Sequence, residues 1–320
     1  MSATRPTPGR IEFLQPSSWA EALEAKASTP EALPIAGGTD VMVDLNFDRG
    51  RPSAIIDLGR VPELLGYQRD GGRLRLGARL TYTQAVDGLG GLAPGLAIAS
   101  RTVGSPQIRN RGTIGGNLGS ASPAGDALPP LLAAGAEVEL CSVRGSRRVA
   151  VGEFFTGPKR SVIEADELIA AVHLPVAAGP QQFAKVGVRN AMVIAVCSLA
   201  LSLDPERRRV GTGIGSAGPT PLRATQAERF LEGVLESEGL WASRGQLGEP
   251  TVTRFGELVA AAARPIDDVR GTATYRRHAL SVLARRTLGW VWDHYRRDDR
   301  HDQHDRHDRH DRHDRHDGRG

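Results

Sequence analysis

The sequence predicts a protein of mixed helices and strands, built as two domains and a disordered tail. Strand and helix patterns alternate from residue 10 to 65, and an alternating apolar and polar pattern then indicates a β-hairpin. The segment PVAAGPQ, which ends at Gln181, breaks regular structure and precedes a stretch of different texture. We therefore expect domains over residues 1–178 and 179–297, with the first divided into lobes over about 10–65 and 66–178.

The first domain opens with a predicted helix, WAEALEAKA, which Ser17 and Ser18 precede and which has Glu21 in its first turn. LPIAGGTD predicts a short strand that runs into a glycine turn, VMVDLNF a helix, and SAIIDLGR another strand, which together make a small α/β lobe. RLRLGARL alternates apolar and polar residues next to the Asp70–Gly72 turn, so we expect a hairpin at the start of the second lobe.

The second domain is predicted to contain a strand at Val193–Leu203, a helix in ATQAERFLEGV, and a helix from His278 to about Tyr295. From residue 298 to 320 a repeat of His, Asp and Arg offers no apolar residue to bury, so we expect disorder there. Its histidines could bind zinc or nickel without fixed geometry, but a dispensable extension is the favoured interpretation.

Composition excludes several classes of function. A formal charge of +4 and few aromatic residues do not favour nucleic-acid binding. The nearly apolar stretch Ala191–Leu203 is shorter than the roughly twenty residues of a membrane span, so we expect a buried strand. The start shows no secretory signal pattern, which predicts a cytoplasmic protein. Two cysteines, Cys141 and Cys197, are too few for a four-cysteine iron–sulfur or zinc site.

The first candidate binding loop is AGGTD, directly after the predicted strand that ends at Ile35. Adjacent glycines let the backbone turn sharply and approach a ligand, and the following helix start presents free N–H groups to an anion. A phosphate fits, and Thr39 could add its hydroxyl, whereas Asp40 is better suited to cap the helix. Taken alone, the pattern is at least as typical of an ordinary tight turn.

The second candidate loop is TIGGN, followed nine residues after Asn117 by Asp126. Its glycines could bring N–H groups onto a pyrophosphate, while Asn117 and Asp126 could bond hydroxyls of a sugar or ribityl chain. Taken alone, Asp126 is equally well explained as the N-cap of the helix that follows it. A third glycine run, Gly213, Gly215 and Gly218, spells a dinucleotide-binding fingerprint, but two prolines follow where a helix is needed, so we expect a glycine-rich turn.

Several segments taken together resemble one family. They are PIAGGTDVMVDL, VGSPQIRNRGTIGGNLGSASPAGDALPPLLAAGAEVEL, DELIAAVHLP, FAKVGVR and GIGSAGPTPLRA. These are similar to the FAD-binding (medium) subunits of molybdenum hydroxylases, as in carbon monoxide dehydrogenases and the flavin domain of xanthine dehydrogenase. The resemblance covers roughly residues 10–290, and the two glycine loops in this order are more specific than either alone.

The resemblance implies an α+β fold: a two-lobed FAD-binding domain of the vanillyl-alcohol oxidase (PCMH) type, then a smaller α/β domain of the CO dehydrogenase flavoprotein C-terminal type. The glycine loops would wrap the FAD pyrophosphate, Asp126 would hold a hydroxyl, Ile163 would be an apolar flavin contact, and Lys185 a basic one or a solvated surface lysine. The implied cofactor-binding residues are Ile35, Ala36, Gly37, Gly38, Thr39, Asp40, Thr113, Ile114, Gly115, Gly116, Asn117, Asp126, Ile163 and Lys185. The family often has an acidic residue after the arginine that corresponds to Arg189, and this chain does not.

The resemblance also implies an electron relay, with no catalytic acid, base, nucleophile or metal on this chain and with His173 and His278 as structural or surface groups. A [2Fe–2S] small subunit and a molybdenum-cofactor large subunit would complete a dimer of heterotrimers, and FAD would pass electrons to NAD or another acceptor. Two alternatives stay open: a stand-alone FAD-dependent oxidoreductase, and a flavin-free scaffold subunit of the same fold.

Overall fold

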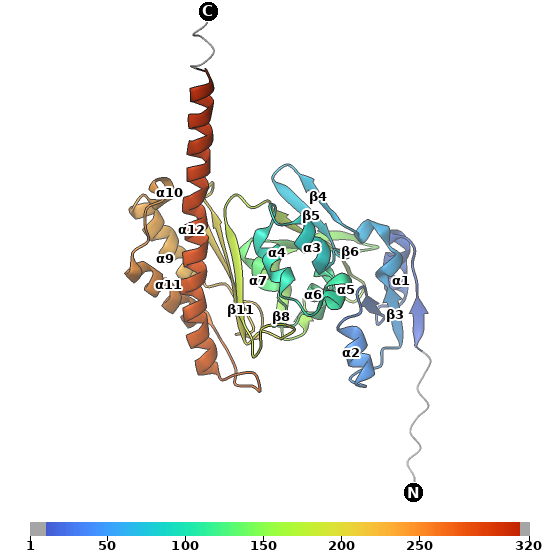
Figure 1. Ribbon diagram of the computed structural model, residues 1–320. Coiled ribbons are helices and arrows are strands. Elements are labelled where there is room, and N and C mark those ends of the chain that lie inside the picture. Colours follow the sequence, from blue (N-terminus) through green and yellow to red (C-terminus); the bar gives the residue numbers. More distant parts are fainter. Residues whose placement is uncertain (1–10, 314–320) are drawn as a thin grey trace, which may run out of the picture.

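The structure is a computed structural model that describes the backbone of residues 11–313 and the side chains of residues 11–297. A small lobe and a larger lobe lie next to each other, and the second domain, with its long helix α12, lies on the far side of the larger lobe (Figure 1). The predicted mixture of helices and strands is confirmed.

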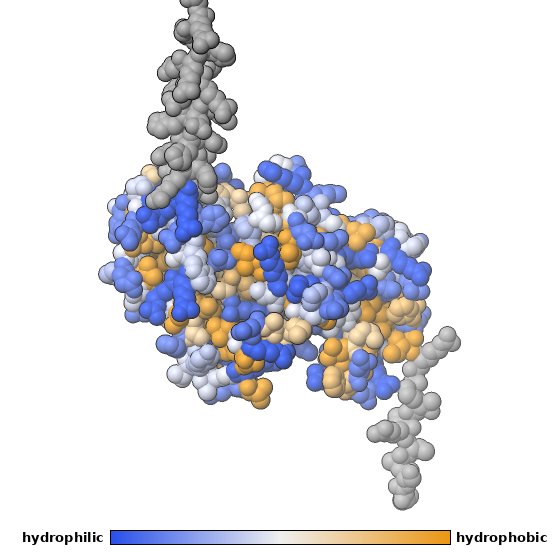
Figure 2. Space-filling view, viewed as in Figure 1, coloured by the Kyte–Doolittle hydropathy of each residue, from blue (hydrophilic) through white to orange (hydrophobic). Residues whose placement is uncertain are grey.

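The small lobe is built on a parallel three-stranded sheet in the order β1-β3-β2. Its elements are β1 (Glu12–Leu14), α1 (Trp19–Ser28), β2 (Leu33–Ile35), α2 (Val41–Asn46), β3 (Ala54–Asp57), η1 (Leu58–Arg60) and η2 (Pro62–Leu64). The Glu21 N–H donates to the Ser18 hydroxyl at 3.2 Å, which confirms the serine-capped helix. Helix α2 buries none of its side chains, and Met42 and Phe47 contribute to the apolar surface at this end of the molecule (Figure 2).

The larger lobe pairs an antiparallel sheet, β4-β5-β10-β6-β7, with helices packed on one of its faces. Core residues from the sheet, such as Leu76 and Val172, pack with residues from the helices, such as Leu96, Ile114 and Leu128. The elements are β4 (Tyr67–Asp70), β5 (Arg73–Gly77), α3 (Tyr82–Gly88), α4 (Pro94–Arg101), α5 (Pro106–Arg111), α6 (Ile114–Ser120), α7 (Leu128–Ala133), β6 (Glu137–Ser142), β7 (Gly145–Ala150), α8 (Val151–Phe154), β8 (Phe155–Gly157), β9 (Arg160–Ser161) and β10 (Leu168–Pro175). The β4–β5 pairing confirms the predicted hairpin.

The second domain packs four helices against an antiparallel sheet, β11-β12-β13. Its elements are β11 (Gln181–Val186), β12 (Cys197–Asp204), β13 (Arg209–Gly215), α9 (Thr225–Ser237), α10 (Leu240–Ser243), α11 (Glu249–Ala262) and α12 (Ala273–His313). The predicted strand at Val193–Leu203 is present but begins at Cys197. Helix α9 matches its prediction, whereas α12 begins before His278.

The third glycine run opens no helix, which agrees with its rejection as a dinucleotide-binding fingerprint, but Gly213 and Gly215 do not lie in a turn. Both are within β13, and only Gly218 follows the strand. A Cβ on Gly213 would lie 2.0 Å from the Pro129 carbonyl oxygen, and one on Gly215 would lie 2.4 Å from the Ser198 hydroxyl. These glycines therefore let α7 of the first domain pack directly on the sheet of the second.

The histidine repeat differs from the sequence expectation in its backbone. Disorder is predicted from residue 298, but α12 continues to His313. The repeat has no proline or glycine in this range and places arginines four residues after aspartates, as in Asp302 and Arg306, a spacing that supports a helix. Residues 314–320 and the side chains of the repeat lie outside the described residues, as does the metal-binding interpretation.

Two further properties concern the described part of the chain as a whole. Between residues 11 and 313, no helix has the length and apolar character to cross a membrane. The described side chains form no group of three or more His, Cys, Asp or Glu residues that could hold a metal ion. His173 is buried, with Nε2 2.6 Å from a Glu139 carboxylate oxygen, so it is a structural residue as predicted.

We expect removal of residues 298–320 to change the free energy of unfolding by less than about 0.5 kcal/mol. The reason is that the last buried side chain described on α12 is Tyr295. A chain that ends at Arg286 also lacks the buried Leu288 and Trp292 and should lose more than about 3 kcal/mol. Urea unfolding of both chains measures this, and an equal loss in the two would contradict the expectation.

Candidate functional site

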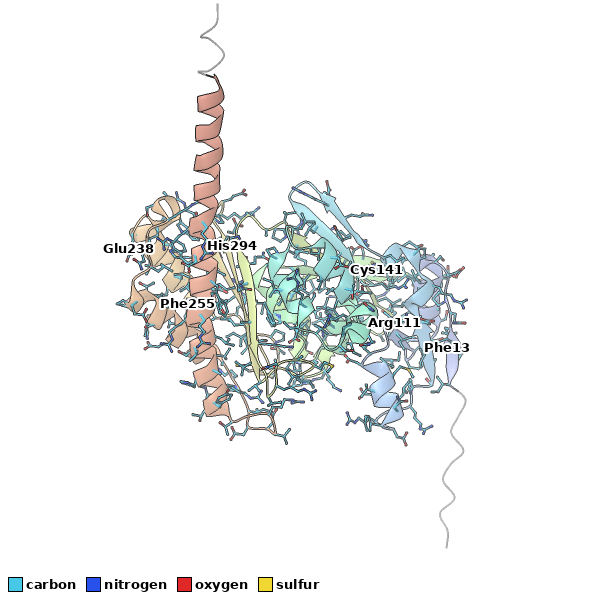
Figure 3. All side chains as sticks on the ribbon, in the orientation of Figure 1. Phe13, Arg111, Cys141, Glu238, Phe255 and His294 are labelled. Atoms are coloured by element: carbon cyan, nitrogen blue, oxygen red, sulfur yellow. The ribbon has the colours of Figure 1, made fainter. Side chains whose placement is uncertain are left out.

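The two predicted glycine loops meet where the small and larger lobes join. A Cβ on Gly37 would lie 1.9 Å from the Arg111 carbonyl oxygen and 3.0 Å from the Gly112 Cα. The Ser120 hydroxyl donates to an Asp40 carboxylate oxygen at 2.6 Å, which links the end of α6 to the first loop. Arg111 is labelled at this boundary between the lobes (Figure 3). The structure therefore brings the AGGTD and TIGGN segments together.

The first loop has free hydrogen-bond donors. Within residues 11–313, the N–H groups of Gly37, Gly38, Thr39 and Asp40 have no acceptor in the protein. Gly38 has a φ of +75°, a conformation that glycine adopts without strain. Asp40 occupies the N-cap position of α2, but its side chain makes no capping bond, because it accepts the Ser120 hydroxyl instead. The capping role predicted for Asp40 is thus wrong, while the free N–H groups fit an anion.

In the second loop, in contrast, most backbone N–H groups donate to acceptors within the protein. The Ile114 N–H donates to the Leu80 carbonyl and the Gly115 N–H to the Ala78 carbonyl, each at 2.9 Å. The Gly116 N–H donates to the Thr113 hydroxyl, which caps α6, and the Asn117 N–H donates to the Thr113 carbonyl. These four N–H groups already have acceptors, whereas the Thr113 N–H has none among the described residues. Of the backbone donors in this loop, the Thr113 N–H is therefore the one available to a pyrophosphate, and the wrapping of a pyrophosphate by the loop stays a prediction.

Gly115 has a packing role in this arrangement. A Cβ there would lie 2.5 Å from the Ala78 carbonyl oxygen, so a larger residue would push α6 away from the end of β5. Thr113 also forms an isolated antiparallel bridge with Thr81. We conclude that TIGGN fixes the geometry of the site by docking on the core of the larger lobe.

Asp126 and Lys185 form a buried ion pair between the two domains. The Lys185 ammonium donates to an Asp126 carboxylate oxygen, Oδ2, at 2.6 Å and to the Thr102 carbonyl at 2.8 Å. The side chains of Lys185 and Asp126 are 10% and 9% exposed, so Lys185 is not a solvated surface lysine. Ala127 occupies the N-cap position of α7, and no side chain caps this helix. The alternative prediction, that Asp126 is the N-cap, is therefore wrong.

The other carboxylate oxygen of Asp126, Oδ1, is buried and has no hydrogen-bond partner among the described residues. Burial raises the pKa of the Asp126 carboxyl above its ordinary value, while Lys185 and the nearby Thr102 hydroxyl act in the opposite direction. That hydroxyl donates to the Ala99 carbonyl at 2.8 Å, so it leaves Oδ1 without a donor. A buried carboxylate oxygen without a donor is uncommon and indicates a donor from outside the chain. The Asn117 side-chain oxygen accepts the Ala127 N–H at 3.3 Å, which holds Asn117 beside this carboxylate. A ligand hydroxyl would satisfy Oδ1.

The remaining predicted site residues lie at the periphery of this arrangement. Ile35 ends β2 directly before the first loop. Ile163 lies between β9 and β10, half-buried against the core of the larger lobe. Arg189, which lacks the acidic neighbour typical of the family, donates instead to the carbonyls of Ala191 and Met192. This keeps the loop after β11 folded on itself, with Val188 and Met192 exposed.

Sequence reasoning missed Ser120 and Tyr82. Ser120 lies among other small residues, and nothing in the pattern marks it as the partner of Asp40. Tyr82 follows the predicted hairpin segment and was assigned no role, yet its ring packs against Gly112 at the meeting point of the two loops. A separate hollow of about 420 Å³ contains none of the predicted site residues; it is lined by Thr83, Val86, Arg101, Pro106, Arg109 and Asn110.

Comparison with known families divides the chain into two parts. Residues 9–177 match the FAD binding domain in molybdopterin dehydrogenase, and residues 182–291 match the CO dehydrogenase flavoprotein C-terminal domain. The two matched ranges correspond to the two lobes of the first domain and to the second domain of the structure.

Similar proteins cover nearly the whole chain. The xanthine dehydrogenase FAD-binding subunit of Escherichia coli O157:H7 is 30% identical over 282 residues, which are 84% of this chain and 91% of that protein. The nicotine 6-hydroxylase medium subunit of Paenarthrobacter nicotinovorans is 30% identical over 285 residues, 87% of this chain and 96% of that protein. The reconstituted CO dehydrogenase from Oligotropha carboxidovorans contains a chain of similar fold, with a TM-score of 0.81, 26% identity, and coverage of 90% of this chain and 99% of that chain.

We expect Gly37→Ala to destabilise the junction of the lobes by about 1–3 kcal/mol, the usual cost of overpacking. The added methyl group would lie 1.9 Å from the Arg111 carbonyl oxygen. Gly90→Ala is the matched control, because no atom lies within 4 Å of a Cβ at that position. Thermal unfolding of the two variants tests this; equal midpoints would show that the close approach of the loops is not needed.

We expect Lys185→Met to cost about 3–5 kcal/mol, because it leaves a buried carboxylate without its counter-ion. Without Lys185, burial raises the pKa of the Asp126 carboxyl in the folded protein further above its ordinary value. The loss of stability is then full above this raised pKa and shrinks as the pH falls through it. It disappears below the ordinary pKa, where the carboxyl binds a proton in both the folded and the unfolded state. The double variant Asp126→Asn, Lys185→Met should recover much of the stability at neutral pH. A loss that does not depend on pH, or no recovery, would contradict this account.

Proposed function

The chain belongs to the family of FAD-binding subunits of molybdenum-containing dehydrogenases, and from this premise we propose that it relays electrons from a partner subunit to a soluble acceptor. Its relatives are flavoprotein subunits of oxidoreductases. The observation that carries the proposal is the combination of free N–H donors in the first loop, at the junction of the lobes, with the unsatisfied Oδ1 of Asp126, between the domains.

The residues present fit FAD. The N–H groups from Gly37 to Asp40 would hold the pyrophosphate, with the Thr39 hydroxyl beside them. Asp126 Oδ1 would accept a hydrogen bond from a hydroxyl of the cofactor, and Lys185 would hold that carboxylate in place through Oδ2. Thr113 and Gly115 would support the site from beneath, while Ile163 would add apolar surface near the flavin.

When bound, FAD supplies a centre that takes up electrons singly or in pairs. The two cysteines of the chain are free and buried, and burial raises the pKa of Cys141 to about 11 and of Cys197 to about 12. Thiols held in this state are poor metal ligands. We therefore assign the electron donor to a separate [2Fe–2S] subunit, and substrate oxidation to a subunit with the molybdenum cofactor.

Exposed apolar residues offer surfaces for such partners. Met42 on α2 and Phe47 directly after it are 47% and 68% exposed, and Val188 and Met192 are 71% and 56% exposed on the loop after β11. Side chains of this size are seldom left in water in groups unless a partner covers them. We propose a heterotrimer, present twice in the assembly, with NAD as the acceptor to test first.

The substrate of the assembly is not a property of this chain under the proposal. The relatives are named as subunits of xanthine dehydrogenase, nicotine 6-hydroxylase and carbon monoxide dehydrogenase, which oxidise chemically unrelated molecules. Because similar flavoprotein subunits belong to enzymes named for different substrates, we assign the choice of substrate to the molybdenum subunit.

We expect the purified chain to bind one FAD, visible as flavin absorbance and recoverable by chromatography after denaturation. Asp126→Asn should weaken FAD binding by about tenfold, because an amide is a weaker acceptor for the ligand hydroxyl than a carboxylate. Asp87→Asn, on the exposed surface of α3, is the matched control. A wild-type chain that binds no FAD would favour the flavin-free scaffold instead.

Two further measurements separate the remaining alternatives. Chains that co-purify with this one should contain [2Fe–2S] clusters and the molybdenum cofactor. If the isolated chain with FAD instead oxidises an organic substrate at a steady rate, the stand-alone oxidoreductase replaces the relay.

A further inference from the structure

Tyr82 lies beneath the meeting point of the two loops. Its N–H donates to the Gly112 carbonyl at 3.1 Å, and a Cβ on Gly112 would lie 3.0 Å from the edge of its ring. A Cβ on Gly37 would lie 3.0 Å from the Gly112 Cα. Gly112 thus lies close to both the Tyr82 ring and the loop with free N–H groups.

The hydroxyl of Tyr82 lacks a partner in the described part of the protein, although the residue is only 4% exposed. Buried tyrosine hydroxyls normally find one. The buried Tyr295 donates its hydroxyl to the Trp241 carbonyl at 2.8 Å, and even the exposed Tyr67 donates to the Gly88 carbonyl at 3.2 Å. Tyr82 therefore has a buried ring, while its hydroxyl oxygen is not fully enclosed and has no acceptor among the described residues.

Burial and nearby charges determine whether this hydroxyl keeps its proton. Burial raises the pKa of the Tyr82 phenol far above its ordinary value, and Asp126 and Asp40 both add to the rise. The phenol thus keeps its proton and can donate it. Both carboxylates also have other donors, since Asp40 accepts from Ser120 and Asp126 Oδ2 accepts from Lys185. Tyr82 therefore lies within range of the charges of both carboxylates.

We propose that the Tyr82 hydroxyl is an additional contact to FAD and donates a hydrogen bond to a pyrophosphate oxygen at the junction of the loops. The inference rests on the proposed function. It also suits the second loop, where four of the five N–H groups are used within the protein: on that side of the site, a side chain adds a donor to the free Thr113 N–H.

The test compares Tyr82→Phe with the wild-type chain in binding FAD, ADP and riboflavin, followed by flavin fluorescence or calorimetry. ADP carries the pyrophosphate without the flavin, and riboflavin carries the flavin without the phosphates. We expect about a tenfold or greater loss of affinity for FAD and ADP, typical of a hydrogen bond to a charged group, and no change for riboflavin. Tyr67→Phe is the matched control and should bind all three like the wild type.

Stability gives a second readout. Without ligand, Tyr82→Phe should unfold at the same temperature as the wild type, because the hydroxyl that it lacks has no protein partner. A destabilised apoprotein would reveal an internal role and overturn the assignment. Unchanged affinity for FAD, or an equal loss for riboflavin, would also overturn it. If the wild-type chain binds none of the three ligands, the proposed function itself fails.

Discussion

The missing Cβ at Gly37 is the constraint on which the candidate site depends. Any side chain there would overlap the Arg111 carbonyl, so only glycine allows the small lobe to press its first loop against the end of α5. That contact places Asp40 within reach of Ser120, and the loop N–H groups have no acceptor among the described residues. The glycines therefore act first on packing between the lobes, and the binding surface is a consequence of that packing.

A similar close approach ties the second domain to the site. Gly213 in β13 lets Pro129 of α7 rest on the sheet, and α7 begins immediately after Asp126. The neighbouring strand β11 brings Lys185 to the same place, where it meets the Asp126 carboxylate. Backbone contact and ion pair thus reinforce one another, and the position of the ligand-facing oxygen depends on both domains being docked.

Much of this fold follows from local sequence patterns, but the contacts that make the site do not. The Ser18 cap, the β4–β5 hairpin and helix α9 each depend on residues close in sequence, and each is found where predicted. The Asp126–Lys185 pair joins residues from different domains, and no spacing announces it. The role of Gly213 was misjudged for the same reason, because a glycine in a turn and a glycine beneath a crossing helix look alike in sequence.

The positions of the hydrogen-bond donors and acceptors limit the orientation in which a ligand can fit the site. The first loop offers N–H donors, which suit a negatively charged group, whereas Asp126 offers a carboxylate oxygen, which repels such a group and suits a hydroxyl. A ligand with both a pyrophosphate and a hydroxylated chain can satisfy the two together only in one orientation. The buried ion pair keeps the acceptor end fixed, and the glycine contact keeps the donor end fixed. Under the proposed function, these two fixed ends would determine the orientation in which FAD binds.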